Sequence, residues 1–178
     1  TEVVRRRVAR DSESESLLAE VAQTARELVD SMGEIVWAID PRRDDLASLI
    51  ARLRHFSATV AEAGGIGFTL ETSPDATRVP LEAGRRRELY LLLKEAAHNA
   101  LRHAGARRVD VRIAVDRGVL HGEVVDDGRG FDPPAGGIGH GLDSMRDRAR
   151  ALGGELEIES AAGRGTRVAI SVPLGGPP

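Results

Sequence analysis

The sequence predicts an α+β protein in which helices cover one face of a mixed, mostly antiparallel sheet, preceded by a long helical arm. Three observations support this prediction. Apolar residues recur at helical spacing over residues 17–40 and again over 84–103. Two pairs of segments with alternating apolar residues are each joined by a short link containing glycine, as in β-hairpins. Strands of this kind bury one face, which the helices can cover.

The helical arm is predicted from an apolar seam whose steps alternate between three and four residues. This spacing forms one stripe along a helix over three heptads, and Pro41 ends the helix because the residue before a proline avoids the α region. The seam consists of Leu18, Val21, Ala25, Leu28, Met32, Ile35 and Ile39. We therefore expect a helical arm at 1–40 and a folded domain at 41–178. An apolar stripe of this length is typical of a helix that packs against partner helices.

The elements within 41–178 follow from apolar periodicity and from helix breakers. A helix is expected over about 44–63, capped by Asp44 or Asp45 and ended by Gly64-Gly65. The charged run at 85–87 is expected to be a solvated helix start. The other expected elements are a strand at 66–72, a helix at 84–103 ended by Gly105, strands at 107–116 and 117–126, a helix at 142–152, and strands at 155–160 and 167–174.

Composition restricts the classes of function. The chain has 178 residues, of which 41% are hydrophobic and 30% charged, as is typical of a soluble globular domain. It has no cysteine, which excludes disulfides, thiol catalysis and cysteine-ligated metals. A net charge of -3 and an aromatic content of 3% do not favour nucleic-acid binding. No apolar run approaches the length of a membrane span. We therefore expect a cytoplasmic protein with no direct nucleic-acid partner.

The predicted helix at 84–103 carries an unusual polar face. Glu95, Asn99, Arg102 and His103 are spaced at i, i+4, i+7 and i+8, so they share one side of the helix. Leucine and alanine residues supply the opposite, apolar side. Taken alone, the polar face is compatible either with a solvated surface or with a binding site.

Two glycine-rich clusters stand near the ends of predicted elements. The first is Asp126-Asp127-Gly128-Arg129-Gly130-Phe131, after a strand, and the second covers 136–142, before a helix. A glycine-rich loop that leads into a helix presents free N–H groups and a partial positive charge, which suit phosphate. A carboxylate at a strand end can accept a hydrogen bond from a flat polar ring. Neither the P-loop motif nor a βαβ dinucleotide motif is present.

The order of these motifs is more specific than any one of them. An E-x-x-x-N helix is followed by D-x-G-x-G, by G-x-G-L at a helix start and by G-x-G-T between two strands. This order resembles the GHKL superfamily of ATP-binding domains. The segment GHGLDSMRDRARALGGELEIES and the later GRGTRVAISVPL are similar to the catalytic part of bacterial sensor histidine kinases whose response regulators carry a helix-turn-helix domain. The resemblance covers roughly residues 17–173 and implies a Bergerat fold that binds ATP and Mg2+.

The resemblance also implies a role for each motif residue. Asn99 would coordinate Mg2+, and Glu95 would be catalytic, positioning or deprotonating the attacking group or a metal-bound water. Asp126 would accept a hydrogen bond from the adenine amino group, with Thr166 behind it. The remaining residues of the implied nucleotide site are Arg102, His103 and His140 along the phosphates, and Gly128, Gly130, Gly139, Gly141 and Leu142 in the glycine-rich loops.

The phosphoacceptor histidine of such a kinase is not recognisable in this sequence. In the subfamily that it resembles, the γ-phosphoryl group passes to a histidine followed directly by an acid, and none of the five histidines here has that neighbour. We expect the arm to be the second helix of a dimerisation hairpin whose first helix, with the histidine, lies upstream of Thr1. No autophosphorylation is then expected from this chain. The implied partners are that helix, a second subunit in a homodimer and a cognate response regulator. The resemblance also implies a sensor region upstream, which can tether such kinases to the membrane.

Three alternatives are weighed against this interpretation. A GHKL serine kinase of the anti-sigma type would lack the heptad arm. A nucleotide-independent dimerisation scaffold would not need the intact Glu95, Asn99 and Asp126. An ATPase of the gyrase or mismatch-repair type would need a long lid and a following transducer domain, which this sequence lacks.

Overall fold

The computed structural model describes residue 37, residues 45–131 and residues 140–175. The elements below belong to one unit of the chain, Pro41–Pro178. They are α2 (Leu46–Gly64), β1 (Gly67–Thr72), the 3-10 helix η2 (Pro74–Arg78), α3 (Ala83–Arg102), β2 (Arg108–Asp116), β3 (Val119–Asp126), α4 (His140–Ala151), β4 (Glu155–Ser160) and β5 (Thr166–Pro173). The predicted arm helix lies outside the described residues, apart from Trp37.

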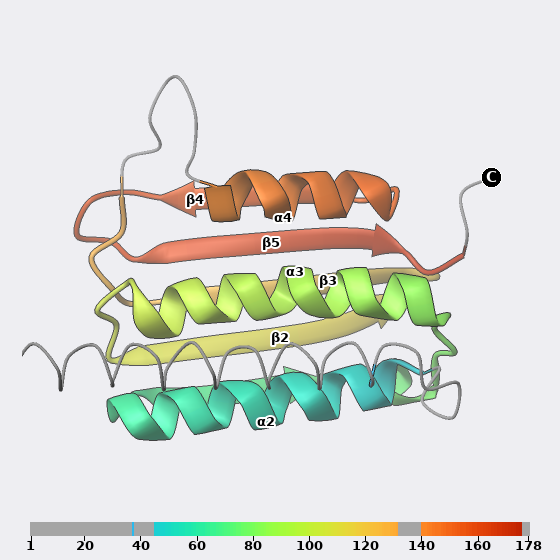
Figure 1. Ribbon diagram of the computed structural model, residues 1–178, viewed down its shortest axis with the longest axis horizontal. Helices are drawn as coiled ribbons and strands as arrows, with labels where there is room; N and C mark the ends of the chain where they lie inside the picture. Colours follow the sequence, from blue (N-terminus) through green and yellow to red (C-terminus); the bar gives the residue numbers. More distant parts are fainter. Residues whose placement is uncertain (1–36, 38–44, 132–139, 176–178) are drawn as a thin grey trace, which may run out of the picture. The chain divides into compact units, whose positions relative to one another are not determined.

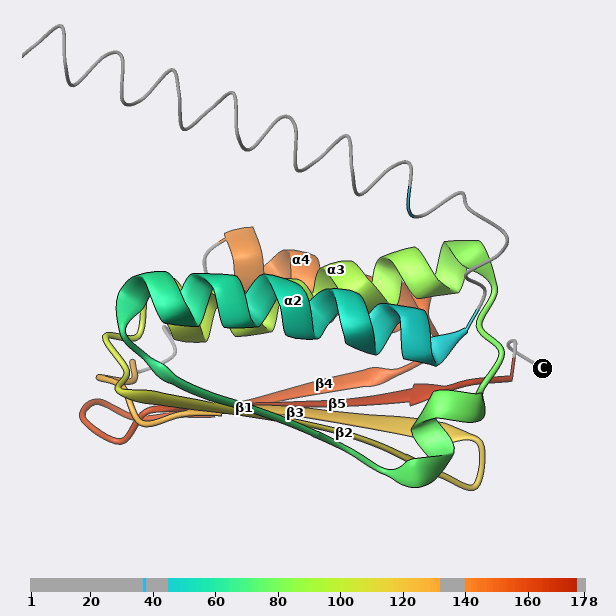
Figure 2. The same cartoon turned by 90° about the horizontal axis from the view of Figure 1, so that it is seen from below.

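The described strands form a single five-stranded sheet in the order β1-β2-β3-β5-β4. β1 runs parallel to β2 at one edge, and the other neighbours are antiparallel. Helices α2, α3 and α4 lie side by side over one face of this sheet (Figures 1 and 2). The predicted α+β architecture, with helices on one face of a mixed, mostly antiparallel sheet, is therefore confirmed.

The core lies between the sheet and its helical layer. The strands contribute their alternate residues to it, because side chains of a strand point to opposite faces in turn. The residues buried from the strands include Val109, Val111, Ile113, Leu120, Val124, Val168, Ile170 and Val172, and those from the helices include Leu46, Leu49, Leu53, Leu89, Leu92, Leu93, Ala96, Ala100 and Met145. Helix α3 lies between α2 and α4 in Figure 1, so the helix with the predicted polar face is central to the layer.

Several predicted boundaries are confirmed with their physical cause. Asp45 caps α2, since its Oδ1 accepts a hydrogen bond from Ser48 N at 2.6 Å. Gly65 ends α2 in the left-handed region with φ 64°. Arg117 and Gly118 both have positive φ in the two-residue β2–β3 turn, as a tight hairpin with the right-handed strand twist requires. Among the described helices, none is both long and apolar enough to cross a membrane.

The arginine run at the start of α3 corrects the prediction of a solvated helix start. Arg86 is fully buried, because it lies on the same helical face as Leu89 and Leu93. The Nη2 atom of Arg85 donates to the carbonyl oxygen of Leu152 at 3.1 Å, which ties α3 to the end of α4. Charge in the sequence did not reveal which side of this helix the core would cover.

Candidate functional site

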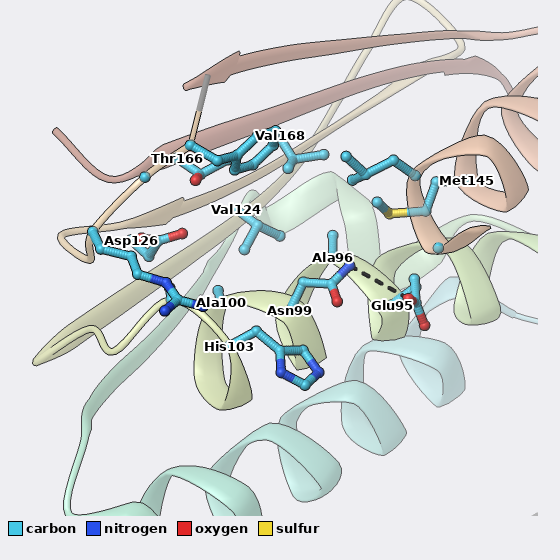
Figure 3. A pocket seen from close by; sticks show the side chains of 16 residues that line it. Glu95, Ala96, Asn99, Ala100, His103, Val124, Asp126, Met145, Thr166 and Val168 are labelled. Carbon is cyan, nitrogen blue, oxygen red and sulfur yellow. Dashed lines mark hydrogen bonds between the residues drawn. The ribbon is translucent and has the colours of Figure 1, made fainter. Parts of the chain in front are cut away.

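A cavity of about 430 Å³ opens between α3, the start of α4 and the adjoining ends of β3 and β5 (Figure 3). Its volume falls within the range of about 300–1,000 Å³ that is usual for small-molecule sites. The lining residues are Glu95, Ala96, Asn99, Ala100, His103 and Ala104; Val124, Asp126, Arg129, Gly130 and Phe131; Gly141, Leu142 and Met145; and Thr166 and Val168. The cavity thus brings together segments that are far apart in the sequence.

Polar side chains stand at both ends of the cavity, with an apolar wall between them. Glu95 and Asn99 of α3 stand at one end, and Asp126 and Thr166 of the sheet stand at the other (Figure 3). Apolar side chains, with Val124 among them, form the wall between these polar ends. A ligand that fills the cavity would therefore meet polar groups at both ends and apolar surface between them.

The pair at the first end is preorganised by the helix. The spacing of four residues places Glu95 and Asn99 one turn apart on α3, and Asn99 Nδ2 donates to Glu95 Oε1 at 3.4 Å. An ionised carboxylate only accepts hydrogen bonds, so the amide turns its nitrogen toward Glu95. The Oδ1 atom of Asn99 is then left for another partner, such as a cation.

The start of α4 approaches this pair closely. A Cβ atom at Gly141 would lie 2.5 Å from Glu95 Oε1, which is closer than real contacts allow. Any larger residue at this position would displace the end of the Glu95 side chain, so glycine lets the first turn of α4 stand over the carboxylate where it now lies. This turn also borders the cavity, where the N–H groups of a helix N-terminus favour an anion.

The carboxylate at the second end is buried. Asp126 is 7% exposed, and its Oδ1 accepts a hydrogen bond from Gly128 N at 2.8 Å. Burial raises the pKa of Asp126 above its ordinary value, while the N–H groups of Gly128 and Thr166 oppose that rise. Thr166 is its direct partner across β3 and β5. A buried carboxylate that keeps acceptor capacity suits a ligand with an N–H group.

The loop after β3 is fixed from several sides. Arg129 N donates to the carbonyl oxygen of Ala104 at 2.8 Å, and Gly163 N donates to that of Arg129 at 2.6 Å. The Oδ1 atom of Asp127 accepts from the backbone N–H groups of Arg107 and Arg108, both at 2.8 Å, and these bonds lower the pKa of Asp127. The loop is thus held against the end of α3 and against the β4–β5 turn.

Most of the predicted site residues line this one cavity. They are Glu95, Asn99, His103, Asp126, Gly130, Gly141, Leu142 and Thr166. Arg102 is exposed on the last turn of α3, and Gly128 is buried against Ala104. Neither of these two is among the described lining residues. Gly139 lies outside the described residues, and so does the side chain of His140.

Sequence reasoning missed the apolar wall of the cavity. Ala96, Ala100, Val124, Met145 and Val168 all line it. Their periodicity correctly assigns them to buried faces, but burial in a core and burial at a cavity wall produce the same pattern. Two further lining residues had no role assigned from the sequence. They are Arg129, at a variable position of the D-x-G-x-G motif, and Phe131, which directly follows that motif.

Two glycines of the β4–β5 turn provide a matched test of the site. Gly163 and Gly165 both have positive φ, at 77° and 71°, but a Cβ at Gly165 would lie 2.0 Å from the carbonyl oxygen of Asp126, whereas one at Gly163 meets nothing within 4 Å. We expect Gly163→Ala to cost roughly 1–2 kcal/mol of stability from backbone strain. Gly165→Ala should add roughly 1–3 kcal/mol from overpacking. Equal losses in denaturant unfolding would contradict this packing.

His98 lies on the side of α3 that faces α2. Its ring lies next to the ring of His103, which lines the cavity. Its ring centroid is 5.4 Å from that of His103 and 6.4 Å from that of Phe56. Burial lowers the pKa of His98 below its ordinary value, with Glu95 opposing this effect and nearby cations adding to it.

A folded state that resists protonation of His98 binds fewer protons than the unfolded chain, so stability should fall as the pH drops below about 6.5 and level off below the folded pKa. The parent chain should melt at a lower temperature at pH 5.5 than at pH 7.5. We expect this decrease to be smaller in His98→Phe, which retains a ring but has no group that takes up a proton. An unchanged pH profile in this variant would argue against the lowered pKa.

Within the described residues, no group of three or more histidine, aspartate and glutamate side chains could hold a metal ion. A cation at this cavity would therefore take few ligands from the protein. Mg2+ suits such a site, because it usually keeps several waters and is held by one or two side chains together with substrate phosphates. Asn99 Oδ1, left free by the bond to Glu95, fits that requirement.

Comparisons with known proteins agree with this geometry. The family model for histidine kinase-, DNA gyrase B-, and HSP90-like ATPases matches residues 84–176, which include both polar ends of the cavity. Sensor histidine kinase LiaS of Bacillus subtilis is 32% identical over 101 residues, which cover 56% of this chain and 28% of LiaS. An uncharacterized sensor-like histidine kinase of Chloroflexus aurantiacus is 34% identical over 123 residues, which cover 64% of this chain and 20% of that protein. The chain thus spans less than a third of these relatives.

Solved structures of histidine kinases also resemble this chain. The histidine kinase domain of the Erythrobacter litoralis EL346 blue-light activated histidine kinase matches with a TM-score of 0.59 and 28% identity, over 71% of this chain and 61% of that one. Histidine kinase AdeS of Acinetobacter baumannii matches with a TM-score of 0.64 over 91% of this chain and 84% of that one, at 16% identity, which supports the fold alone. The chain therefore belongs to the histidine kinase-, DNA gyrase B-, and HSP90-like ATPase family, and its relatives include sensor histidine kinases.

Proposed function

We propose that this chain binds ATP with Mg2+ as the catalytic domain of a sensor histidine kinase and transfers the γ-phosphoryl group to a histidine outside the ATP-binding domain. The observation that carries the proposal is the arrangement of one cavity. It has the Glu95–Asn99 pair at one end and the buried Asp126 beside Thr166 at the other.

The sheet end of the cavity suits the base. The adenine ring is flat and largely apolar, and its amino group donates hydrogen bonds. Asp126 can accept such a bond, because the bond from Gly128 N uses part of its acceptor capacity and leaves the rest. The apolar wall, including Val124 and Val168, would contact the faces of the ring. Removing this apolar surface from water favours binding.

The helix end of the cavity suits the phosphates. Asn99 Oδ1 would ligate Mg2+, and the first turn of α4 would offer backbone N–H groups to phosphate oxygens. His103 lines the same side of the cavity and can donate to an oxygen. Bound Mg2+ would supply neutralisation of the phosphate charge. Arg102 and His140 remain proposed contributors along the triphosphate. Gly128 is proposed to let the backbone close around the base, and Gly139 to release the loop over the triphosphate.

Glu95 is proposed as the catalytic residue. Its carboxylate is held by Asn99 and lies against Gly141, so its position relative to the cavity is defined on two sides. From this place it would orient the attacking histidine or accept its proton, as a general base within hydrogen-bond reach does. The remainder of the catalysis would be positioning and electrostatic stabilisation, as in phosphoryl transfer generally.

The organisation of the longer kinase is part of the proposal. We propose residues 1–40 as the second helix of a dimerisation and phosphoacceptor hairpin, and residues 41–178 as the ATP-binding domain. The relatives named sensor histidine kinases support two-component partners in general. The specific partners proposed here are the phosphoacceptor helix, a second copy of the chain and a cognate response regulator.

Isothermal titration calorimetry with a non-hydrolysable ATP analogue, with and without Mg2+, tests the binding step. We expect a free energy of about -5 to -8 kcal/mol, corresponding to sub-millimolar to micromolar dissociation constants, and weaker binding without metal. The matched control is the corresponding GTP analogue, which lacks an amino group at the same ring position and should bind more weakly. Absence of binding at millimolar ATP analogue would contradict the proposal.

A further inference from the structure

Three polar side chains form a row across the sheet at the base end of the cavity. Thr166 of β5 is the direct partner of Asp126 on β3 and, on its other side, of Ser160 on β4. Directly paired residues of neighbouring strands project from the same face of a sheet. Asp126 and Thr166 line the cavity, whereas Ser160 is not among the described lining residues and stands behind Thr166.

The hydroxyl group of Ser160 has three partners. Phe131 N donates to Ser160 Oγ at 2.9 Å. Ser160 Oγ lies 3.1 Å from the carbonyl oxygen of Gly165 and 3.0 Å from Thr166 Oγ1. A serine hydroxyl has one proton to donate and two lone pairs that can accept, so the identity of each partner decides the direction of every bond.

The directions follow by elimination. The backbone N–H of Phe131 can only donate, so it occupies one lone pair of Ser160. The carbonyl oxygen of Gly165 can only accept, so the Ser160 proton is directed to it. The bond to Thr166 must then use the second lone pair of Ser160, with the Thr166 hydroxyl as the donor. With its proton used in this way, Thr166 presents only lone pairs to the cavity.

We propose that Ser160 is a positioning residue for base selection, because it holds the Thr166 hydroxyl as an acceptor beside the Asp126 carboxylate. This inference rests on the proposed function, and it names a determinant of base choice outside the cavity wall. In the proposed function, the 6-substituent of the purine faces these two acceptors. The amino group of adenine can donate to them directly or through a bridging water. The carbonyl oxygen of guanine at the same place would set acceptor against acceptor.

The same hydroxyl also fixes the loop that borders the base. Phe131 lines the cavity, and its backbone nitrogen is held by Ser160. The carbonyl of Arg129 in the same loop is held by Gly163 N of the β4–β5 turn. Ser160 therefore holds two residues that line the cavity, Thr166 at its hydroxyl group and Phe131 at its backbone nitrogen, without lining it itself. Of these two contacts, only the one to Thr166 sets the hydrogen-bonding character of a group beside Asp126.

The test compares the dissociation constants of ATP and GTP analogues, both with Mg2+, for the parent chain and for Ser160→Ala. Removing the Ser160 hydroxyl frees the Thr166 proton, so Thr166 can donate to a carbonyl oxygen. We expect the preference for ATP over GTP to fall by about tenfold, in line with one hydrogen bond gained or lost. Ser160→Thr, which retains a hydroxyl group, should keep the preference of the parent chain for ATP over GTP. Ser171→Ala on β5 is the matched control and should leave the preference unchanged.

A double-variant comparison separates this role from a general structural one. If Ser160 acts on the base through the Thr166 hydroxyl, Ser160→Ala should have little further effect on the ATP/GTP ratio once Thr166→Val has removed that hydroxyl. Should Ser160→Ala fail to fold by circular dichroism, Ser160→Cys serves in its place, because a thiol is of similar size but accepts hydrogen bonds weakly.

The possible outcomes distinguish the two proposals. If the parent chain prefers ATP and Ser160→Ala keeps the same ratio, the role of Ser160 is overturned while the proposed function stands. If the ratio falls equally in the presence and absence of the Thr166 hydroxyl, the action through Thr166 is overturned. If the parent chain binds neither analogue, the proposed function and the role of Ser160 are both overturned.

Discussion

Replacing Asn99 with alanine is expected to abolish the Mg2+-dependent part of nucleotide binding and leave the fold intact. Asn99 Oδ1 is free to ligate the metal because the amide nitrogen is directed to Glu95. Loss of an outer-shell partner commonly lowers metal affinity by about 10- to 100-fold, and loss of a direct ligand should exceed that. Alanine is the strongest helix former, so α3 should remain stable.

The measurement for Asn99→Ala is calorimetric titration of an ATP analogue at increasing Mg2+ concentration, with the melting temperature recorded beside it. Arg87→Ala, on the exposed side of the same helix, is the matched control and should bind like the parent chain. Asn99→Asp keeps an oxygen ligand and should retain part of the Mg2+ dependence. An Asn99→Ala protein that binds the nucleotide with normal Mg2+ dependence would falsify the assignment of Asn99 as a metal ligand.

Asp126→Asn is expected to weaken ATP binding by about 10- to 100-fold, because a hydrogen bond to a charged group contributes roughly 1.5–3 kcal/mol. The carboxamide is nearly the same shape as the carboxylate, so the effect should be chemical rather than steric. Gly128 N requires an acceptor at its present contact, so the asparagine oxygen should take that place. The amide nitrogen then replaces the oxygen available to the ligand, and a donor faces the adenine amino group.

The neighbouring aspartate is the control for this prediction. Asp127 is exposed, and its carboxylate binds the backbone N–H groups of Arg107 and Arg108 rather than facing the cavity. Asp127→Asn should therefore change base selection little. Competition between ATP and GTP analogues measures both variants. A parent chain that binds the two analogues equally, or a larger loss of selectivity in Asp127→Asn, would count against Asp126 as the group that recognises adenine.

Local signals in the sequence were sufficient wherever a feature depended on near neighbours. Asp45 caps α2 and Gly65 ends it, as expected from residues adjacent to those boundaries. Positive φ at Arg117 and Gly118 accompanies the predicted β2–β3 hairpin. The spacing of Glu95 and Asn99 likewise needs only the period of one helix. These features depend on backbone geometry over a few residues, so periodicity and turn chemistry identify them.

Contacts between segments that are distant in the sequence could not be predicted from local signals. β1 joins the sheet in parallel beside β2, with η2 and α3 between them in the chain. Nothing in the alternation of residues 67–72 specifies that neighbour. The burial of Arg86 is similar, because its neighbours in the sequence are charged but the core covers its side of α3. Both depend on which surfaces meet after the chain has folded.

The sequence by itself determined the element types and most helix and turn boundaries. Those properties follow from the 3.6- and 2-residue periods and from the backbone preferences of glycine, proline and aspartate. The residues at the two polar ends of the site were expected from the resemblance of their motifs to those of a known family. Tertiary structure alone decided that α3, β3, α4 and β5 enclose one cavity and that Ser160 stands behind Thr166. Hydrogen-bond direction and cavity shape depend on distances between segments that the sequence separates, and folding alone brings those segments within contact.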